Sequence, residues 1–148
     1  ALLAEEPLNE IRHRPLNQKP YWHVERARLD DSRKVRVELV VNGKVEAHAD
    51  IAAKGDIHDI KFDYTPEQSS WVALRIFPTC HTNPIFVEVD GQPIRASKKS
   101  AQWCLDAVDV CWNSKQGRIR ASEREQAKAA YDHAKAAYRK ILSETTRE

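Results

Sequence analysis

The clearest pattern of apolar and polar positions lies between residues 34 and 52. Apolar side chains alternate there with charged ones on both sides of Asn42-Gly43, a dipeptide that two-residue hairpin turns favour. Because a period of two places the apolar side chains on one face of a strand, we predict two antiparallel strands joined at Asn42-Gly43.

A second strand-like region covers residues 69–96. Residues 71–77 are apolar except for Arg75, and a strand that is apolar on both faces is usually central in its sheet. Pro78 ends this strand because proline has no amide hydrogen to donate. Beyond a polar corner, residues 85–89 alternate again. Asp90-Gly91 then predicts a second hairpin turn, with a returning strand over residues 93–95.

Weaker alternation over residues 21–29 and 60–64 predicts two further strands. The total is about seven short strands, which is typical of a two-sheet sandwich. We therefore expect an immunoglobulin-like antiparallel β-sandwich over residues 21–97. Residues 1–20 are polar and interrupted by prolines, and we expect them to be a linker from an upstream domain.

From residue 98 onward the apolar period changes to that of a helix. We predict a first helix capped by Ser97 or Ser100 and a second helix with a capping box at Ser122 and Glu125. The apolar stripe of the second helix is rich in alanine. The expected fold is therefore mainly β, with a C-terminal helical pair over residues 98–148. We expect this pair to pack on the sandwich and to cover Trp71 and Phe77.

Composition excludes several classes of protein. The 148 residues carry a net charge of +2 with both signs mixed, which does not indicate nucleic acid binding. No apolar segment approaches the length of a membrane span. Three cysteines do not make a disulfide framework, so we expect mainly free thiols, with one bridge left open. A homo-oligomer is also left open. Because the chain begins without methionine, we expect a piece of a longer protein. Its localisation cannot be read from this end of the chain, and we only slightly favour a secreted or periplasmic location over a cytoplasmic one.

The polar corner supplies the candidate catalytic residues, which are Cys80, His81 and Asn83. His81 would act as a base oriented by Asn83, with Cys80 as the neighbouring nucleophile. The alternative is a structural corner whose polar side chains bond the backbone, and we favour it. The six histidines form no His-x-His or His-x-x-x-His pair, and no Cys-x-x-Cys occurs, so we predict no metal site in this chain.

Two groups of residues are candidates for binding. Tyr21 and Trp22 could form an aromatic platform for a carbohydrate or a protein. Arg95, Lys98 and Lys99 could line a surface for an anionic partner, but we favour a solvated helix end, since no interleaved aromatic residues or glycine-rich loop accompany them.

Three runs carry a resemblance to a known family. They are KPYWHVERARLDDSRKVRVELVVNGK, SSWVALRIFPTCHTNPIFVEVDGQPIRASKKSAQWCLDAVDVCW and AAYDHAKAAYRKIL. Together they resemble the C-terminal region of CehA/McbA-type metallohydrolases, a branch of the PHP (polymerase and histidinol phosphatase) superfamily. The resemblance extends from Lys19 to Leu142.

The resemblance implies that the metal-dependent chemistry belongs to an upstream PHP domain. The opening His-x-His of that domain does not occur here, so no catalytic residue is carried over, and a divalent metal is expected only in the upstream domain. We therefore expect a non-catalytic accessory module that packs on or orients the catalytic domain. One alternative is an independent carbohydrate- or protein-binding module. Another is a small hydrolase that uses Cys80 and His81.

Overall fold

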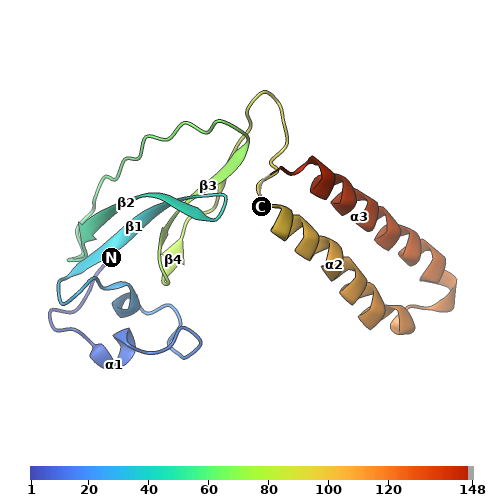
Figure 1. Ribbon diagram of the computed structural model, residues 1–148. Helices are drawn as coiled ribbons and strands as arrows, with labels where there is room; N and C mark the ends of the chain where they lie inside the picture. Colours follow the sequence, from blue (N-terminus) through green and yellow to red (C-terminus); the bar gives the residue numbers. More distant parts are fainter. Residues whose placement is uncertain (147–148) are drawn as a thin grey trace. The chain divides into compact units, whose positions relative to one another are not determined.

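The computed structural model describes residues 1–146, and Figure 1 shows the arrangement of its helices and strands. The chain divides into two compact units, Ala1–Gln92 and Pro93–Glu148. The first unit holds all the strands and the second holds the two long helices. No helix of the described residues is both long enough and apolar enough to cross a lipid bilayer.

The first unit contains one antiparallel sheet of five strands. The strand order is β2-β1-β3-β4, and β5 also pairs with β3. The bounds are β1 Lys34–Val41, β2 Lys44–Ala52, β3 Ser70–Ile76, β4 Cys80–His81 and β5 Ile85–Val87.

The hairpin predicted over residues 34–52 is confirmed by the pairing of β1 with β2. Asn42 and Gly43 form its turn with φ values of 50° and 87°, the positive range that a two-residue turn of this kind requires. The prediction of a central strand is also confirmed, because β3 pairs with β1 on one side and with β4 and β5 on the other.

The predicted seven-stranded immunoglobulin-like sandwich is wrong. The described residues form a single sheet, and three segments expected to be strands are not strands. Residues 21–29 contain the 3-10 helix η1, Val24–Ala27. Glu25 and Arg28, whose charges suggested an exposed strand, are instead a buried ion pair spaced three residues apart, a spacing that suits a helical turn.

The strands predicted over residues 60–64 and 93–95 do not form either, for different reasons. In residues 60–64, Ile60 and Phe62 are half-buried while Lys61 and Asp63 are exposed, but the backbone is not part of the sheet. The Asp90-Gly91 turn forms, yet no strand returns from it. The hydroxyl of Ser69 bonds the turn at both ends and takes the place of strand pairing. It accepts from Val89 N–H (2.8 Å) and donates to Gln92 O (2.5 Å).

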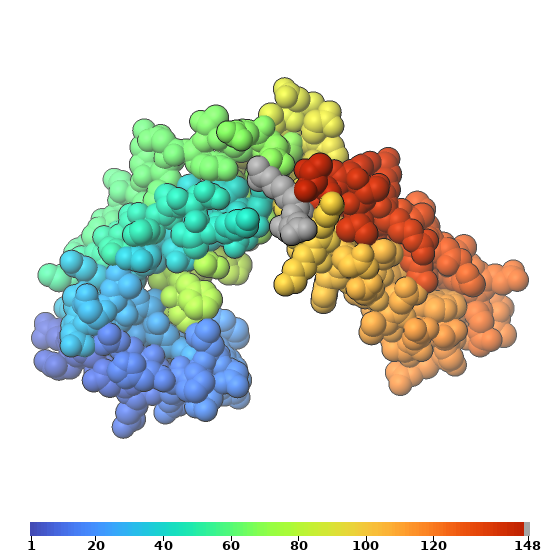
Figure 2. Space-filling view, in the orientation of Figure 1, coloured from blue at the N-terminus to red at the C-terminus, as the bar shows by residue number. Residues whose placement is uncertain are grey.

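The buried core of the first unit includes its N-terminal residues. Leu3 is 1% exposed and packs in one cluster with Ala27, Val35 and Ala53. Its N–H donates to the carbonyl oxygen of Ala53 at 2.8 Å. A short helix, α1 Asn9–Arg12, follows. Residues 1–20, expected as a linker, thus belong to this unit, and Figure 2 shows the blue N-terminal residues in one continuous body with the light blue residues that follow.

The second unit is an antiparallel pair of helices, α2 Lys98–Lys115 and α3 Arg124–Glu144. The 3-10 helices η2 Gln116–Arg118 and η3 Ala121–Glu123 connect them. Ser97 caps α2 as one of the two predicted caps, because its hydroxyl accepts from Ser100 N–H at 3.2 Å. The predicted capping box is wrong, since Ser122 lies inside η3 and α3 begins only at Arg124.

Two contacts fix the register of α2 against α3. The rings of Trp112 and Tyr131 lie 5.2 Å apart between centroids, and Lys135 forms an ion pair with Asp109. In each pair the two residue numbers add up to about 243. A constant sum is expected for two antiparallel helices, because the residue number rises along one helix at the rate at which it falls along the other. Of the two rings that we expected the helical pair to cover, Phe77 is 52% exposed and Trp71 is half-buried.

Candidate functional site

The candidate site lies on the face of the sheet that carries Trp71, Ala73 and Arg75, the alternate residues of β3. We call this the groove face. The opposite face carries the buried side chains of β1, which are Val35, Val37, Leu39 and Val41. A groove with a volume of about 490 Å³ runs along the groove face. It is lined by Val40, Gly43, Trp71, Ala73, Arg75, His81, Thr82, Pro84 and Phe86.

The strand register brings the apolar part of this lining together. Ala73 lies opposite Val40, which is 4% exposed and forms the floor. Trp71 lies opposite Phe86, which is 67% exposed. Residues directly opposite on antiparallel strands share a face, so an indole and a phenyl ring both line one end of the groove.

Asn42 holds the segment that carries Trp71. Its side-chain oxygen accepts from Trp71 N–H (3.1 Å), and its amide nitrogen donates to Ser70 Oγ (2.9 Å). Its own N–H donates to the carbonyl oxygen of Trp71 at 3.0 Å. The hairpin turn therefore also fixes where β3 begins and where the indole stands.

The other end of the groove is polar but balanced in charge. Arg75 donates to Glu38 at 2.5 Å, and its guanidinium lies 5.3 Å from the centre of the Phe77 ring. A cation over an aromatic face is a favourable contact. Because Arg75 is already paired with a carboxylate and a ring, the groove offers an anion little free positive charge.

The candidate catalytic residues Cys80 and His81 make up the short strand β4, opposite Ile76 and Arg75. Both residues line the second hollow described below, but successive side chains of a strand point to opposite faces, which does not favour a thiol and an imidazole set against each other. The imidazole Nδ1 is 2.9 Å from the carbonyl oxygen of Thr82. A carbonyl oxygen only accepts, so Nδ1 carries the proton and is occupied by the backbone. Asn83 is exposed in the loop that follows.

Thr82 and Thr79 hold this corner through the backbone. Thr82 Oγ1 accepts from Leu74 N–H (3.1 Å), and Thr82 N–H donates to the carbonyl oxygen of Leu74 (2.9 Å). Thr79 Oγ1 donates to the carbonyl oxygen of Ile76 at 2.9 Å. These contacts are those of a structural corner, in which polar side chains satisfy the backbone at the end of β3.

A second hollow of about 510 Å³ lies beside this corner and brings Trp22 next to it. The indole of Trp22 is 75% exposed and the ring of Tyr21 is 39% exposed. Their planes meet at 66° with 5.9 Å between the centroids. The two rings do face solvent, but they do not form the coplanar platform on which a sugar ring stacks.

The predicted basic residues Arg95, Lys98 and Lys99 belong to the second unit. Arg95 is committed to Glu144, to which it donates two hydrogen bonds of 2.8 and 2.6 Å. Lys98 and Lys99 are exposed at the start of α2. The positive end of the helix dipole also lies there, so these lysines suit a solvated helix end.

Within residues 1–146, no group of three or more histidine, cysteine or acidic side chains is arranged to hold a metal ion. Cys80, Cys104 and Cys111 are free thiols.

No family model matches the chain, and no curated protein or solved structure matches it. The likeness to the CehA/McbA-type metallohydrolases therefore stays an expectation from the sequence, and the geometry of the groove face is the firmest basis for a functional proposal.

Sequence reasoning missed the groove-lining residues Trp71, Phe86 and Arg75 as a site. The available signal was the apolar character of residues 71–77 on both faces, since a single sheet covered on one side leaves the other set of apolar side chains for a partner.

Proposed function

We propose that the first unit is a non-catalytic binding module that holds an apolar segment of another polypeptide in the groove. The observation that carries the proposal is the pairing of Trp71 with Phe86 over the floor formed by Val40 and Ala73. Concave sites lined mostly by apolar and aromatic side chains, with few polar groups at one end, are typical of binding sites.

A polypeptide is favoured over a carbohydrate by the composition of the groove. Aromatic anchors contribute much of the binding energy at protein interfaces. On the groove face, the exposed apolar surface continues beyond the groove at Phe77, the alternate residue after Arg75, which is 52% exposed. A continuous apolar surface with a balanced ion pair at one end suits leucine- or phenylalanine-like side chains better than the hydroxyls of a sugar.

The proposed partner is a metal-dependent hydrolase domain to which this chain is an accessory. Support comes from the sequence resemblance described above, which extends across residues 19–142. A groove that accepts an apolar segment of a neighbouring domain would orient that domain without adding a catalytic group.

Direct hydrolysis by Cys80 and His81 is disfavoured by their positions. They are consecutive residues of β4 and therefore project to opposite faces. The imidazole is also bonded to the backbone rather than to an orienting side chain. A nucleophile and its base need to lie within hydrogen-bond reach of each other.

The proposal is tested by selecting random displayed peptides on the immobilised full chain and measuring the affinity of the selected peptides. Phe86→Asp should weaken binding by about 2 kcal/mol or more, roughly 30-fold in Kd. Ile57→Asp is the matched control, because Ile57 is 96% exposed and is not part of the groove lining. Failure to enrich apolar peptides, or equal binding by the Phe86→Asp variant, contradicts the proposal.

Two parallel assays separate the alternatives. A glycan array that gives binding sensitive to Phe86→Asp would replace the polypeptide with a carbohydrate ligand. Phosphatase and esterase assays with added divalent metal should show no turnover. Metal-dependent turnover that His81→Ala removes would overturn the non-catalytic assignment.

A further inference from the structure

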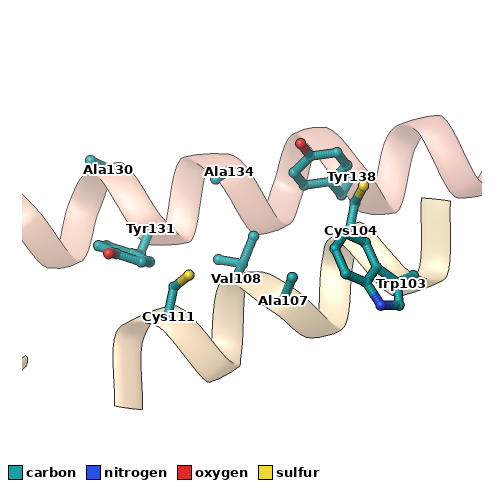
Figure 3. Close-up of a pocket in the computed structure, with 9 residues that line it drawn as sticks. All are labelled: Trp103, Cys104, Ala107, Val108, Cys111, Ala130, Tyr131, Ala134 and Tyr138. Carbon is teal, nitrogen blue, oxygen red and sulfur yellow. The ribbon is translucent and has the colours of Figure 1, made fainter. Parts of the chain in front are cut away.

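The second unit carries an apolar groove along one side of its helical pair. Figure 3 shows the groove with side chains from both helices directed into it. Its volume is about 370 Å³. The lining consists of Trp103, Cys104, Ala107, Val108, Cys111, Ala130, Tyr131, Ala134 and Tyr138.

The α2 side of this groove exposes large apolar side chains, and the α3 side exposes small ones. Trp103, which lines the groove, is 71% exposed, and Val110, seven residues further along the same side of α2, is 67% exposed. On α3, Ala130 and Ala134 line the groove, and Ala137 follows them at helical spacing on the same side of the helix. The large side chains on α2 of one molecule can therefore pack against the alanines on α3 of a second, identical molecule.

The charges at the rim of the groove are also complementary between α2 of one molecule and α3 of another, with an acidic residue on α2 and basic residues on α3. Asp106 lies on the α2 rim, and within the described residues no cation is paired with it. Lys140 and His133 lie on the α3 rim, seven residues apart, and Lys140 also lies 3.8 Å from a carboxylate oxygen of Glu144 on its own helix. From the register of the two helices, Asp106 is level with Ala137, between these two basic residues along the axis.

We propose that this groove is the contact surface for a second copy of the chain, which completes a four-helix bundle. A twofold axis parallel to the helices lays α2 of one copy against α3 of the other and keeps every residue at its own level along the bundle. All neighbouring helices are then antiparallel, as in many four-helix bundles. Val110 meets the alanine stripe of the second copy, and Asp106 comes between its His133 and Lys140.

The area of the contact surface indicates how tightly two copies are expected to bind. With a rise of about 1.5 Å per residue and helices about 10 Å wide, the face is roughly 27 Å by 20 Å, or about 1,100 Å² over both copies. Stable interfaces bury about 1,200–2,000 Å². We therefore expect a dimer that dissociates on dilution.

Sedimentation of the full chain over a range of concentrations tests the proposal. The expected mass rises with concentration from 17.0 kDa to twice that value. The native thiols report on the surface at the same time, because Cys104 and Cys111 line the groove and Cys80 is exposed on the first unit. Alkylation of Cys104 and Cys111 should slow as concentration rises, while that of Cys80 stays constant.

Variants locate the contact. Val110→Lys should abolish the dimer with an unchanged circular dichroism spectrum, since Val110 is exposed in the single chain. Ala136→Lys is the control, because Ala136 is exposed and two residues beyond Ala134, on the far side of α3. Asp106→Lys should weaken the dimer, and Lys140→Glu added to it should restore the dimer.

Three results would overturn the proposal. One is a single-chain mass at every concentration with Cys104 and Cys111 fully reactive. Another is a single-chain mass at every concentration with Cys104 and Cys111 resistant to alkylation throughout, which would mean that another part of the same chain covers the groove. The third is an oligomer that Val110→Lys leaves intact, which places the contact elsewhere.

Discussion

Arg28 and Glu25 form an ion pair that is almost completely buried, with the two residues 5% and 1% exposed. Arg28 donates to both carboxylate oxygens, at 2.5 and 3.0 Å. It also donates to the carbonyl oxygens of Ala4 and Ser32, while the N–H of Leu8 donates to Glu25. One pair thus joins the N-terminal segment, the 3-10 helix η1 and the turn before β1.

Replacing Glu25 with glutamine should destabilise the first unit by about 3–5 kcal/mol, because it leaves the Arg28 charge buried without its partner. Urea denaturation monitored by circular dichroism measures the loss. Glu46→Gln is the control, since Glu46 is exposed on β2, and it should change stability by less than about 0.5 kcal/mol. Equal effects of the two variants would show that the buried pair contributes nothing specific.

Acid should remove the same stabilisation. Burial alone would raise the pKa of Glu25, but hydrogen bonds from Arg28 and Leu8 and the charge of Arg28 outweigh burial, so its pKa is lowered. A lowered pKa in the folded chain means that the stabilisation is complete above the unfolded pKa, about 4.3. It is then lost as the pH falls through the folded value.

The urea midpoint should therefore fall as the pH drops from about 5 to about 2. Asp50 adds to this trend, because a side-chain hydrogen bond from Arg36 lowers its pKa as well. In the Glu25→Gln variant the midpoint should depend less on pH over this range. An acid dependence identical to that of the unchanged chain would contradict the assignment to Glu25.

Adjacent leucines offer a direct test of the N-terminal contribution to the core. Leu3 is 1% exposed, whereas Leu2 is 63% exposed. Leu3→Ala should lower the free energy of unfolding by about 2–5 kcal/mol, since it leaves a cavity in the core. Leu2→Ala should cost less than about 0.5 kcal/mol. Similar small losses for both variants would show that the N-terminal residues do not pack as described.

The Asn42 side chain should matter both for stability and for the groove. Asn42→Ala places a residue with a Cβ but no polar side chain at φ 50° and leaves the N–H of Trp71 without its acceptor. We expect a loss of about 1–3 kcal/mol. Asn42→Asp keeps the acceptor oxygen and should cost less. Peptide binding to the groove should weaken in Asn42→Ala, and unchanged stability and binding would refute the role given to Asn42.

Local signals could be read correctly from the sequence. The hairpin of β1 and β2 depends on alternation and on Asn42-Gly43, both of which act over a few residues. The two long helices likewise follow from their own periodicity. The strand expected at residues 21–29 could not be excluded, because only tertiary contacts show that Glu25 and Arg28 face inward.

The candidate site was harder to predict than the elements. Trp71 and Phe86 come from β3 and β5, and only the strand register places them opposite each other. Cys80 and His81 stand out in the sequence because they are adjacent. In the structure they are consecutive residues of a strand, and the side chains of consecutive strand residues point to opposite faces.

The division into two compact units has a consequence for how any melting experiment is interpreted. Trp71 lies in the sheet and Trp112 lies in the helical pair, so each unit contains its own fluorophore. If the units melt independently, a single calorimetric peak would hide two events, and a two-state fit would assign them one meaningless enthalpy. Chains that keep only Trp71 or only Trp112 would resolve the two events, and substitutions at Leu3 or Glu25 would shift one curve and leave the other in place.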